Sequence, residues 1–134
     1  MSERKKCILI VDDERIHRIG IRDRLRHAGY DVVSAEGGEE ALALIEERQN
    51  YALIVLDLLM PQPNGFEVFR HLQKKSVTSR IPILILTVVV RVDARVQELV
   101  DHGASYLHKD EIPERLVEMV HELIGPPQID SGSA

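Results

Sequence analysis

The sequence contains very little cysteine, few aromatic residues and no tryptophan. Its one cysteine, Cys7, excludes an internal disulfide, and no group of cysteine and histidine residues has the spacing of a zinc site. A protein without disulfides suits a reducing compartment, and we expect a cytoplasmic location.

Long apolar runs and an excess of positive charge are also lacking. No run approaches the roughly 18 to 20 apolar residues that span a bilayer, so we expect no membrane insertion. The apolar run after the charged N-terminus ends at Val11, which leaves no signal-peptide core. A net charge of −5 argues against direct nucleic-acid binding, which requires a basic face.

Short apolar runs alternate with longer amphipathic stretches along the 134 residues. The runs at 7–11, 51–56 and 83–86 are apolar at nearly every position, which is typical of strands covered on both faces. Shorter runs at 32–35 and 105–108 complete a set of five. We expect the Val-rich segment 88–90 to extend the fourth strand; the alternative is that it forms part of a partner surface.

Helical periodicity occupies the stretches between the runs. The predicted helices cover residues 15–28, 39–48, 66–75, 93–101 and 113–124. Because a helix follows every strand, the sheet should be parallel and covered on both faces, as in a doubly wound α/β fold. We expect one domain over residues 5–125, with residues 126–134 forming a tail or linker stub.

Polar residues are predicted to lie at the carboxyl ends of these strands. Asp12 and Asp13 follow the first strand, Asp57 the third, Thr87 ends the fourth and Lys109 follows the fifth. Open α/β sheets bind ligands at this edge, so these side chains should gather there.

This set of residues suits phosphoryl transfer. Three neighbouring carboxylates repel one another unless a cation joins them, and Mg²⁺ prefers oxygen ligands of this kind. A carboxylate beside the metal can attack phosphorus and form an aspartyl-phosphate, while an ammonium group and a hydroxyl stabilise the developing charge.

Several motifs resemble the receiver domain of bacterial two-component response regulators. They are V-D-D-E at 11–14, D-L-L-M-P at 57–61 with Gly65, L-T at 86–87 and Y-L-H-K at 106–109. The resemblance implies a flavodoxin-like (βα)5 fold with strand order 2-1-3-4-5. It also implies a signalling domain that takes a phosphoryl group from the phosphohistidine of a sensor histidine kinase or phosphotransfer protein. Such a domain catalyses its own phosphorylation and dephosphorylation and is not a metabolic enzyme.

The same resemblance assigns the metal ligands. By matching position, Asp13 and Asp57 resemble direct Mg²⁺ ligands. Asp12 resembles a ligand through water, and Leu59 resembles a ligand through its backbone carbonyl.

The remaining roles concern the phosphoryl group. Asp57 resembles the phosphoacceptor, and Thr87 and Lys109 resemble the residues that bind the phosphoryl oxygens. Tyr106 resembles the aromatic switch that turns inward when Thr87 moves toward the phosphate. The fourth helix, fifth strand and fifth helix together resemble the output surface, through which a homodimer is possible.

Three positions depart from the family pattern. Val88 stands where the family usually has a small residue, and we expect it to slow reaction with small phosphodonors. Asp110 replaces a frequent proline, so the Lys109–Asp110 peptide is either trans or strained. Leu59 and Val89 are apolar and cannot orient an attacking water, which predicts a long-lived phosphoryl state.

Other readings of the sequence remain. The first is a receiver-like interaction module that works without phosphorylation. An aspartate-nucleophile phosphatase is disfavoured because position 59 is Leu rather than an acid. A flavin carrier is disfavoured because the acidic D-D-E-R segment would repel its phosphate. The histidines lack ligand spacing, and we expect those on helices, including His17 and His27, to be at the surface or half-buried.

Overall fold

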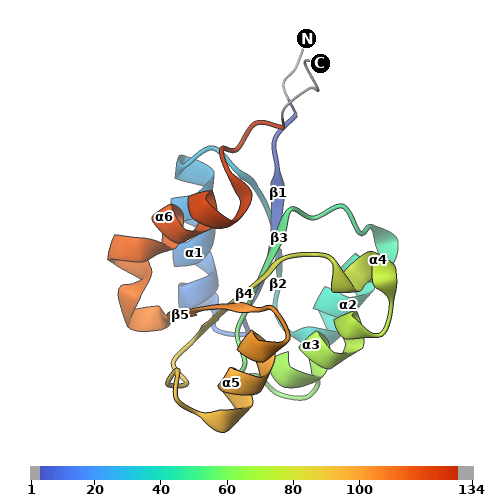
Figure 1. The fold of residues 1–134 in the computed structure, drawn as a ribbon. Coiled ribbons are helices and arrows are strands. Elements are labelled where there is room, and N and C mark those ends of the chain that lie inside the picture. Colours follow the sequence, from blue (N-terminus) through green and yellow to red (C-terminus); the bar gives the residue numbers. More distant parts are fainter. Residues whose placement is uncertain (1–3, 130–134) are drawn as a thin grey trace.

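The computed structural model describes residues 4–129. They form a parallel sheet between two layers of helices (Figure 1). The sheet has five strands in the order β2-β1-β3-β4-β5. Every neighbouring pair of strands is parallel. This arrangement confirms the flavodoxin-like, doubly wound fold and the strand order expected from the sequence.

The strands lie where the short apolar runs predicted them. They are β1 (Cys7–Val11), β2 (Asp31–Ala35), β3 (Leu53–Leu56), β4 (Ile83–Thr87) and β5 (Ser105–His108). All residues of β1, β3 and β4 are buried, because helices cover both faces of these central strands.

The helices include two short elements that the sequence did not predict. The order is α1 (Arg15–His27), α2 (Gly38–Glu47), α3 (Gly65–Gln73), α4 (Ser76–Ser79), α5 (Ala94–Asp101), the 3₁₀ helix η1 (Lys109–Glu111) and α6 (Ile112–Ile124). The helix predicted at 93–101 is therefore α5, and the one predicted at 113–124 is α6. Within residues 4–129, no helix is both long enough and apolar enough to cross a membrane.

The two layers divide the side chains of each strand between them. Ile8 and Ile10 of β1 belong to the core cluster that includes residues of α1 and α6, whereas Leu9 and Val11 belong to the cluster that includes residues of α2, α3 and α5. This alternation follows from the period of two along a strand. Figure 1 shows α1 and α6 on one side of the sheet and α2, α3, α4 and α5 on the other.

The prediction that residues 88–90 extend the fourth strand is wrong. β4 ends at Thr87, whose partner in β5 is His108. On the other side, the β3 pairing already ends at Leu56, opposite Ile85. No neighbouring strand continues beyond this point, so Val88 and Val90 lie exposed in the loop before α5.

The Lys109–Asp110 peptide bond, which the sequence left open, is trans. Within the described residues, the cis peptide bond is Gln62–Pro63.

The segment after α6 returns to the start of the chain at the amino edge of the sheet. The Lys6 N–H donates to the Pro127 carbonyl over 2.7 Å, and the Ile129 N–H donates to the Arg4 carbonyl over 3.0 Å. The Tyr30 hydroxyl donates to the Gly125 carbonyl over 2.6 Å. Residues 126–129 of the expected tail therefore pack against the domain, while residues 130–134 lie outside the described residues.

Candidate functional site

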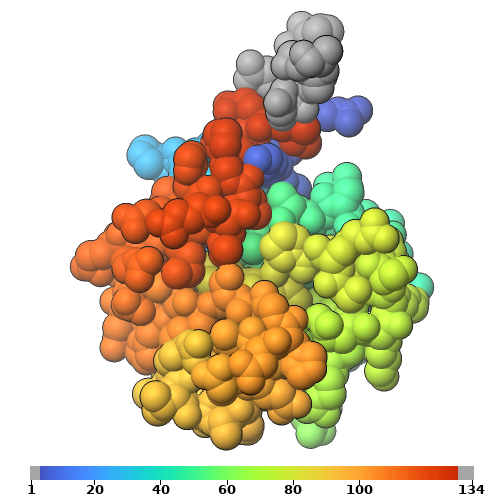
Figure 2. Space-filling view, viewed as in Figure 1, coloured from blue at the N-terminus to red at the C-terminus, as the bar shows by residue number. Residues whose placement is uncertain are grey.

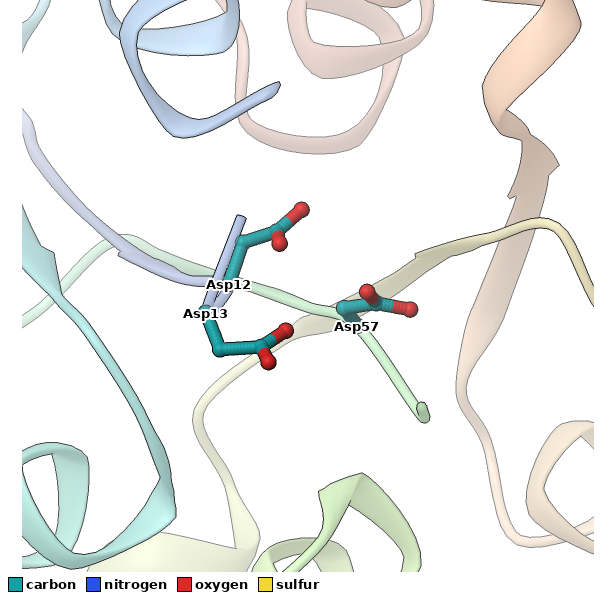
Figure 3. Close-up of side chains that lie close together, drawn as sticks. All are labelled: Asp12, Asp13 and Asp57. Carbon is teal, nitrogen blue, oxygen red and sulfur yellow. The ribbon is translucent and has the colours of Figure 1, made fainter. Parts of the chain in front are cut away.

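Three acids meet at the carboxyl edge of the sheet. Asp12 and Asp13 follow β1, and Asp57 follows β3. In the sheet Val11 lies opposite Leu56, so the residues that come next on the two strands are neighbours. One carboxylate oxygen from each acid lies within 4.8 Å of the others, as Figure 3 illustrates.

Backbone groups hold the two buried acids in place. The Glu14 N–H donates to Asp12 Oδ1 over 2.9 Å, and the Leu59 N–H donates to Asp57 Oδ1 over 3.3 Å. Each acid therefore keeps its second oxygen, Oδ2, for contacts inside the cluster. Asp13 is exposed and gives the cluster a side open to solvent.

Lys109 joins the two buried acids. It follows β5 directly, and its Nζ lies 2.7 Å from Asp12 Oδ2 and 3.0 Å from Asp57 Oδ2. The Lys109 side chain is 7% exposed, so these ion pairs form in a low-dielectric environment. The sequence prediction that Lys109 lies with Asp12 and Asp57 at one edge of the sheet agrees with these contacts.

Burial and charge act in opposite directions on the two ends of this ion pair. Burial raises the pKa of Asp12, although hydrogen bonds from Lys109 and from the Glu14 N–H oppose that rise. Burial alone would lower the pKa of Lys109, but its contacts with Asp12 and Asp57 outweigh burial and raise it. Lys109 therefore remains an ammonium group at neutral pH.

The donor set fits a divalent cation. With all three acids ionised, three carboxylates and one ammonium leave two negative charges, which one Mg²⁺ would balance. Carboxylate oxygens with a solvent-exposed side suit an ion that keeps several waters. For Leu59 the contact found is its N–H with Asp57, and the metal role of its carbonyl stays a prediction.

Thr87 and Tyr106 are linked through one residue of the loop after β4. The buried Thr87 Oγ1 accepts a hydrogen bond from the Val89 N–H over 3.4 Å. The Tyr106 hydroxyl donates to the carbonyl of the same Val89. Tyr106 is half-buried against the core on the α5 side of the sheet. The backbone of Val89 therefore connects the end of β4 with the aromatic ring on β5.

The sequence analysis missed His17. Its Nδ1 lies 2.8 Å from Lys109 Nζ and 3.2 Å from Glu14 Oε2. His17 is half-buried, in line with the expectation of a surface or half-buried position, but its contact with Lys109 was not foreseen. The available signal was its place one helical turn after Asp13, at the start of the helix that begins at this edge.

Known proteins resemble this chain over most of its length. The model of the response regulator receiver domain family matches residues 8–121. The chain is 38% identical over 112 residues to the phosphate regulon transcriptional regulatory protein PhoB of Pseudomonas aeruginosa, covering 84% of this chain and 48% of that protein. It is 40% identical over 126 residues to the response regulator MprA of a Mycobacterium species, covering 93% and 53%. The chain spans about half the length of the curated relatives it matches.

Solved structures with the same fold include chains that this chain covers almost completely. The chemotaxis response regulator CheY4 of Vibrio cholerae superposes with a TM-score of 0.79 at 31% identity, covering 89% of this chain and 98% of that chain. The response regulator TrrA of Thermotoga maritima, solved in complex with Mg(2+)-BeF, has a TM-score of 0.75 at 34% identity, covering 88% and 98%.

Proposed function

Since this chain belongs to the response regulator receiver domain family of two-component systems, we propose that Asp57 is its phosphoacceptor. The observation that carries the proposal is the contact of a buried carboxylate with a buried ammonium beside two further acids. Asp57 Oδ2 lies 3.0 Å from Lys109 Nζ, and Asp12 and Asp13 stand next to it. This combination gives a nucleophile, a cation site and a charge-neutralising group at one point.

The metal would be held by the acid cluster. We assign Asp13 and Asp57 as direct Mg²⁺ ligands, Asp12 as a ligand through water and the Leu59 carbonyl as a further ligand. When bound, Mg²⁺ supplies positive charge that offsets the repulsion between the carboxylates and the incoming phosphoryl group.

The chain's own residues carry out the transfer. A carboxylate oxygen of Asp57 attacks the phosphorus of a phosphohistidine, the P–N bond breaks, and its electron pair stays on the departing imidazole nitrogen. Lys109 donates hydrogen bonds to the phosphoryl oxygens, and the Thr87 hydroxyl donates another. These contacts lower the barrier because the charge develops on those oxygens.

The conformational switch would pass through Val89. If the Thr87 hydroxyl turns to the phosphoryl group, Oγ1 gives up its hydrogen bond with the Val89 N–H. The Val89 carbonyl holds the Tyr106 hydroxyl, so a shift of this loop releases the ring to turn inward. The change would then reach the surface formed by α5, β5 and α6.

Partner surfaces follow from the same arrangement. Ile16, Leu59 and Val88 are exposed apolar residues within three positions of Asp13, Asp57 and Thr87 in the sequence. We propose that a phosphohistidine-bearing kinase or phosphotransfer domain contacts them. In Figure 2, α5 and α6 occupy neighbouring parts of one face of the molecule. We propose this α5–β5–α6 face as the output or homodimer surface. The cytoplasmic location stays a prediction from the sequence.

Intact-mass spectrometry after incubation with Mg²⁺ and a small phosphodonor tests this function. We expect the mass of one phosphoryl group to be added to the wild type, and none after Mg²⁺ is chelated. Asp57→Ala should gain nothing, whereas Asp23→Ala, which removes an exposed acid in the middle of α1, should react like the wild type.

A slow or absent mass gain with small phosphodonors is tested further by a substitution at Val88. If small donors react slowly because Val88 narrows the entrance, Val88→Ala should react faster. If neither protein gains mass, even with a phosphorylated kinase domain as donor, the phosphoacceptor assignment is wrong and the interaction-module alternative is favoured.

A further inference from the structure

Lys109 contacts three acceptors, and one of them is not an acid. Its Nζ lies 2.7 Å from Asp12 Oδ2, 3.0 Å from Asp57 Oδ2 and 2.8 Å from His17 Nδ1. A lysine ammonium has three N–H bonds. Hydrogen bonds from it go to Asp57 Oδ2 and His17 Nδ1, and Asp12 Oδ2 is held as an ion pair. We propose that His17 is a positioning residue, which holds Lys109 at the phosphoacceptor site through a neutral imidazole. This inference rests on the function proposed above and deepens it.

The contact fixes the state of the His17 ring. An ammonium group has no lone pair, so the short contact requires that Nδ1 accept the hydrogen bond. The ring proton must then be on Nε2. Glu14 Oε2, 3.2 Å from the same Nδ1, would require a proton there instead. The Glu14 side chain is 63% exposed and can turn to water, whereas Lys109 is 7% exposed and cannot.

Unlike Asp12 and Asp57, His17 is not a group for which the divalent cation or the phosphoryl group competes with Lys109. Asp12 and Asp57 are the groups that a divalent cation draws on, and Asp57 is also the group that changes when it accepts a phosphoryl group. A neutral imidazole outside the acid cluster keeps its lone pair through both events. His17 is therefore the contact that keeps the Lys109 ammonium aimed at the edge of the sheet while its other contacts rearrange.

Substitutions at His17 separate this role from simple packing. His17→Leu keeps a branch point at Cγ, now sp³ instead of the sp² ring carbon, but removes the acceptor. His17→Asn keeps an acceptor oxygen on Cγ, where Nδ1 is now. His27→Leu is the matched control, because His27 is exposed at the far end of the same helix.

The first readout is the rate of phosphorylation with Mg²⁺ and a small phosphodonor. We expect His17→Leu to be about fivefold to tenfold slower, since one hydrogen bond to a charged group is lost. His17→Asn and His27→Leu should stay within about twofold of the wild type. If the wild type is phosphorylated and His17→Leu reacts equally fast, the inference is overturned while the proposed function stands. If the wild type is not phosphorylated by any donor, both fall.

The second readout needs neither metal nor phosphodonor. Long-range ¹H–¹⁵N NMR at about pH 8, above the ordinary imidazole pKa, identifies which ring nitrogen carries the proton. We expect the Nε2–H form for His17, and a changed Nδ1 signal in Lys109→Met while the His27 signals stay the same. A proton on His17 Nδ1 in the wild type would overturn the inference, whether or not Lys109→Met folds.

Discussion

The two edges of the sheet use polar groups in different ways. At the amino edge, side chains bond to backbone carbonyls: Lys6 Nζ donates to Ile124 and the Tyr30 hydroxyl donates to Gly125. At the carboxyl edge, side chains face one another, as in the cluster of Asp12, Asp57 and Lys109. The amino edge therefore completes the hydrogen bonding of the fold, whereas the carboxyl edge keeps reactive groups together.

This difference shows where stability and function separate in one domain. Contacts at the amino edge satisfy backbone groups that would otherwise cost free energy when buried. The carboxyl edge keeps two negative charges in excess, which repel until a cation binds. Substitutions at the amino edge should change the free energy of unfolding alone, while those at the carboxyl edge should change stability and chemistry together.

The largest effect is expected for Lys109→Met at the carboxyl edge. Asp12 and Asp57 would remain buried without their ammonium, which should lower the free energy of unfolding by about 3 to 4 kcal/mol in chelator. Added Mg²⁺ should restore part of this loss, because the cation supplies the missing positive charge. Urea denaturation with and without Mg²⁺ measures both effects. Lys74→Met, an exposed lysine after α3, is the control, and an equal loss there would contradict the account.

Gly65→Ala should have the next largest effect. A Cβ at this position would collide with the carbonyl oxygen of Asp57 and the Cα of Leu58, and neither backbone atom can move freely. We expect a loss of about 2 to 3 kcal/mol in urea denaturation, together with slower phosphorylation of Asp57. Gly20 has open space where its Cβ would lie, so Gly20→Ala should stabilise α1 slightly. Equal stabilities of the two variants would refute this explanation.

Cation binding should weaken as the pH falls. The pKa of Asp12 is raised, mainly by burial, so the folded protein holds this proton to higher pH than an unfolded chain does. Ionisation of Asp12 therefore lowers the free energy of unfolding as the pH rises from the usual aspartate pKa of about 3.9 through the raised pKa. Over that range of pH, protons compete with the cation for Asp12. We expect Mg²⁺ affinity, measured by calorimetry, to fall as the pH is lowered from neutral into that range. Asp12→Asn should show a smaller dependence on pH.

The smallest effect is expected for Tyr30→Phe at the amino edge. The loss of the hydrogen bond to the Gly125 carbonyl should cost about 1 kcal/mol in urea denaturation. The phosphorylation rate should not change, because Tyr30 directly precedes β2 and so lies at the edge of the sheet opposite Asp57. If Tyr30→Phe slowed phosphorylation while the protein stayed folded, the two edges of the sheet would not act independently.

The sequence predicted the strands well because three of them are apolar along their whole length. Parallel pairing then placed Asp12, Asp13 and Asp57 at one edge without further information. The Val-rich segment 88–90 was misjudged because strand propensity does not reveal where the partner strand ends. That boundary depends on the pairing of Thr87 with His108 and of Leu56 with Ile85, which is a property of the whole sheet.

The contact of His17 with Lys109 could not be predicted in the same way. The two residues are 92 positions apart in the sequence. Helical periodicity gives the face on which His17 lies, but not how α1 is rotated against the end of β5. The short helix α4 was missed for a related reason, since four residues carry too little periodicity to detect.

Locating the phosphoryl group on the chain tests the central claim most directly. An aspartyl-phosphate can be reduced with borohydride to homoserine, and peptide mass spectrometry then identifies the modified position. The account predicts homoserine at position 57 and an unmodified aspartate at positions 12 and 13. A phosphoryl group on any other residue, or its retention in Asp57→Ala, would contradict the assignment of the carboxyl edge as a phosphoacceptor site built around Asp57.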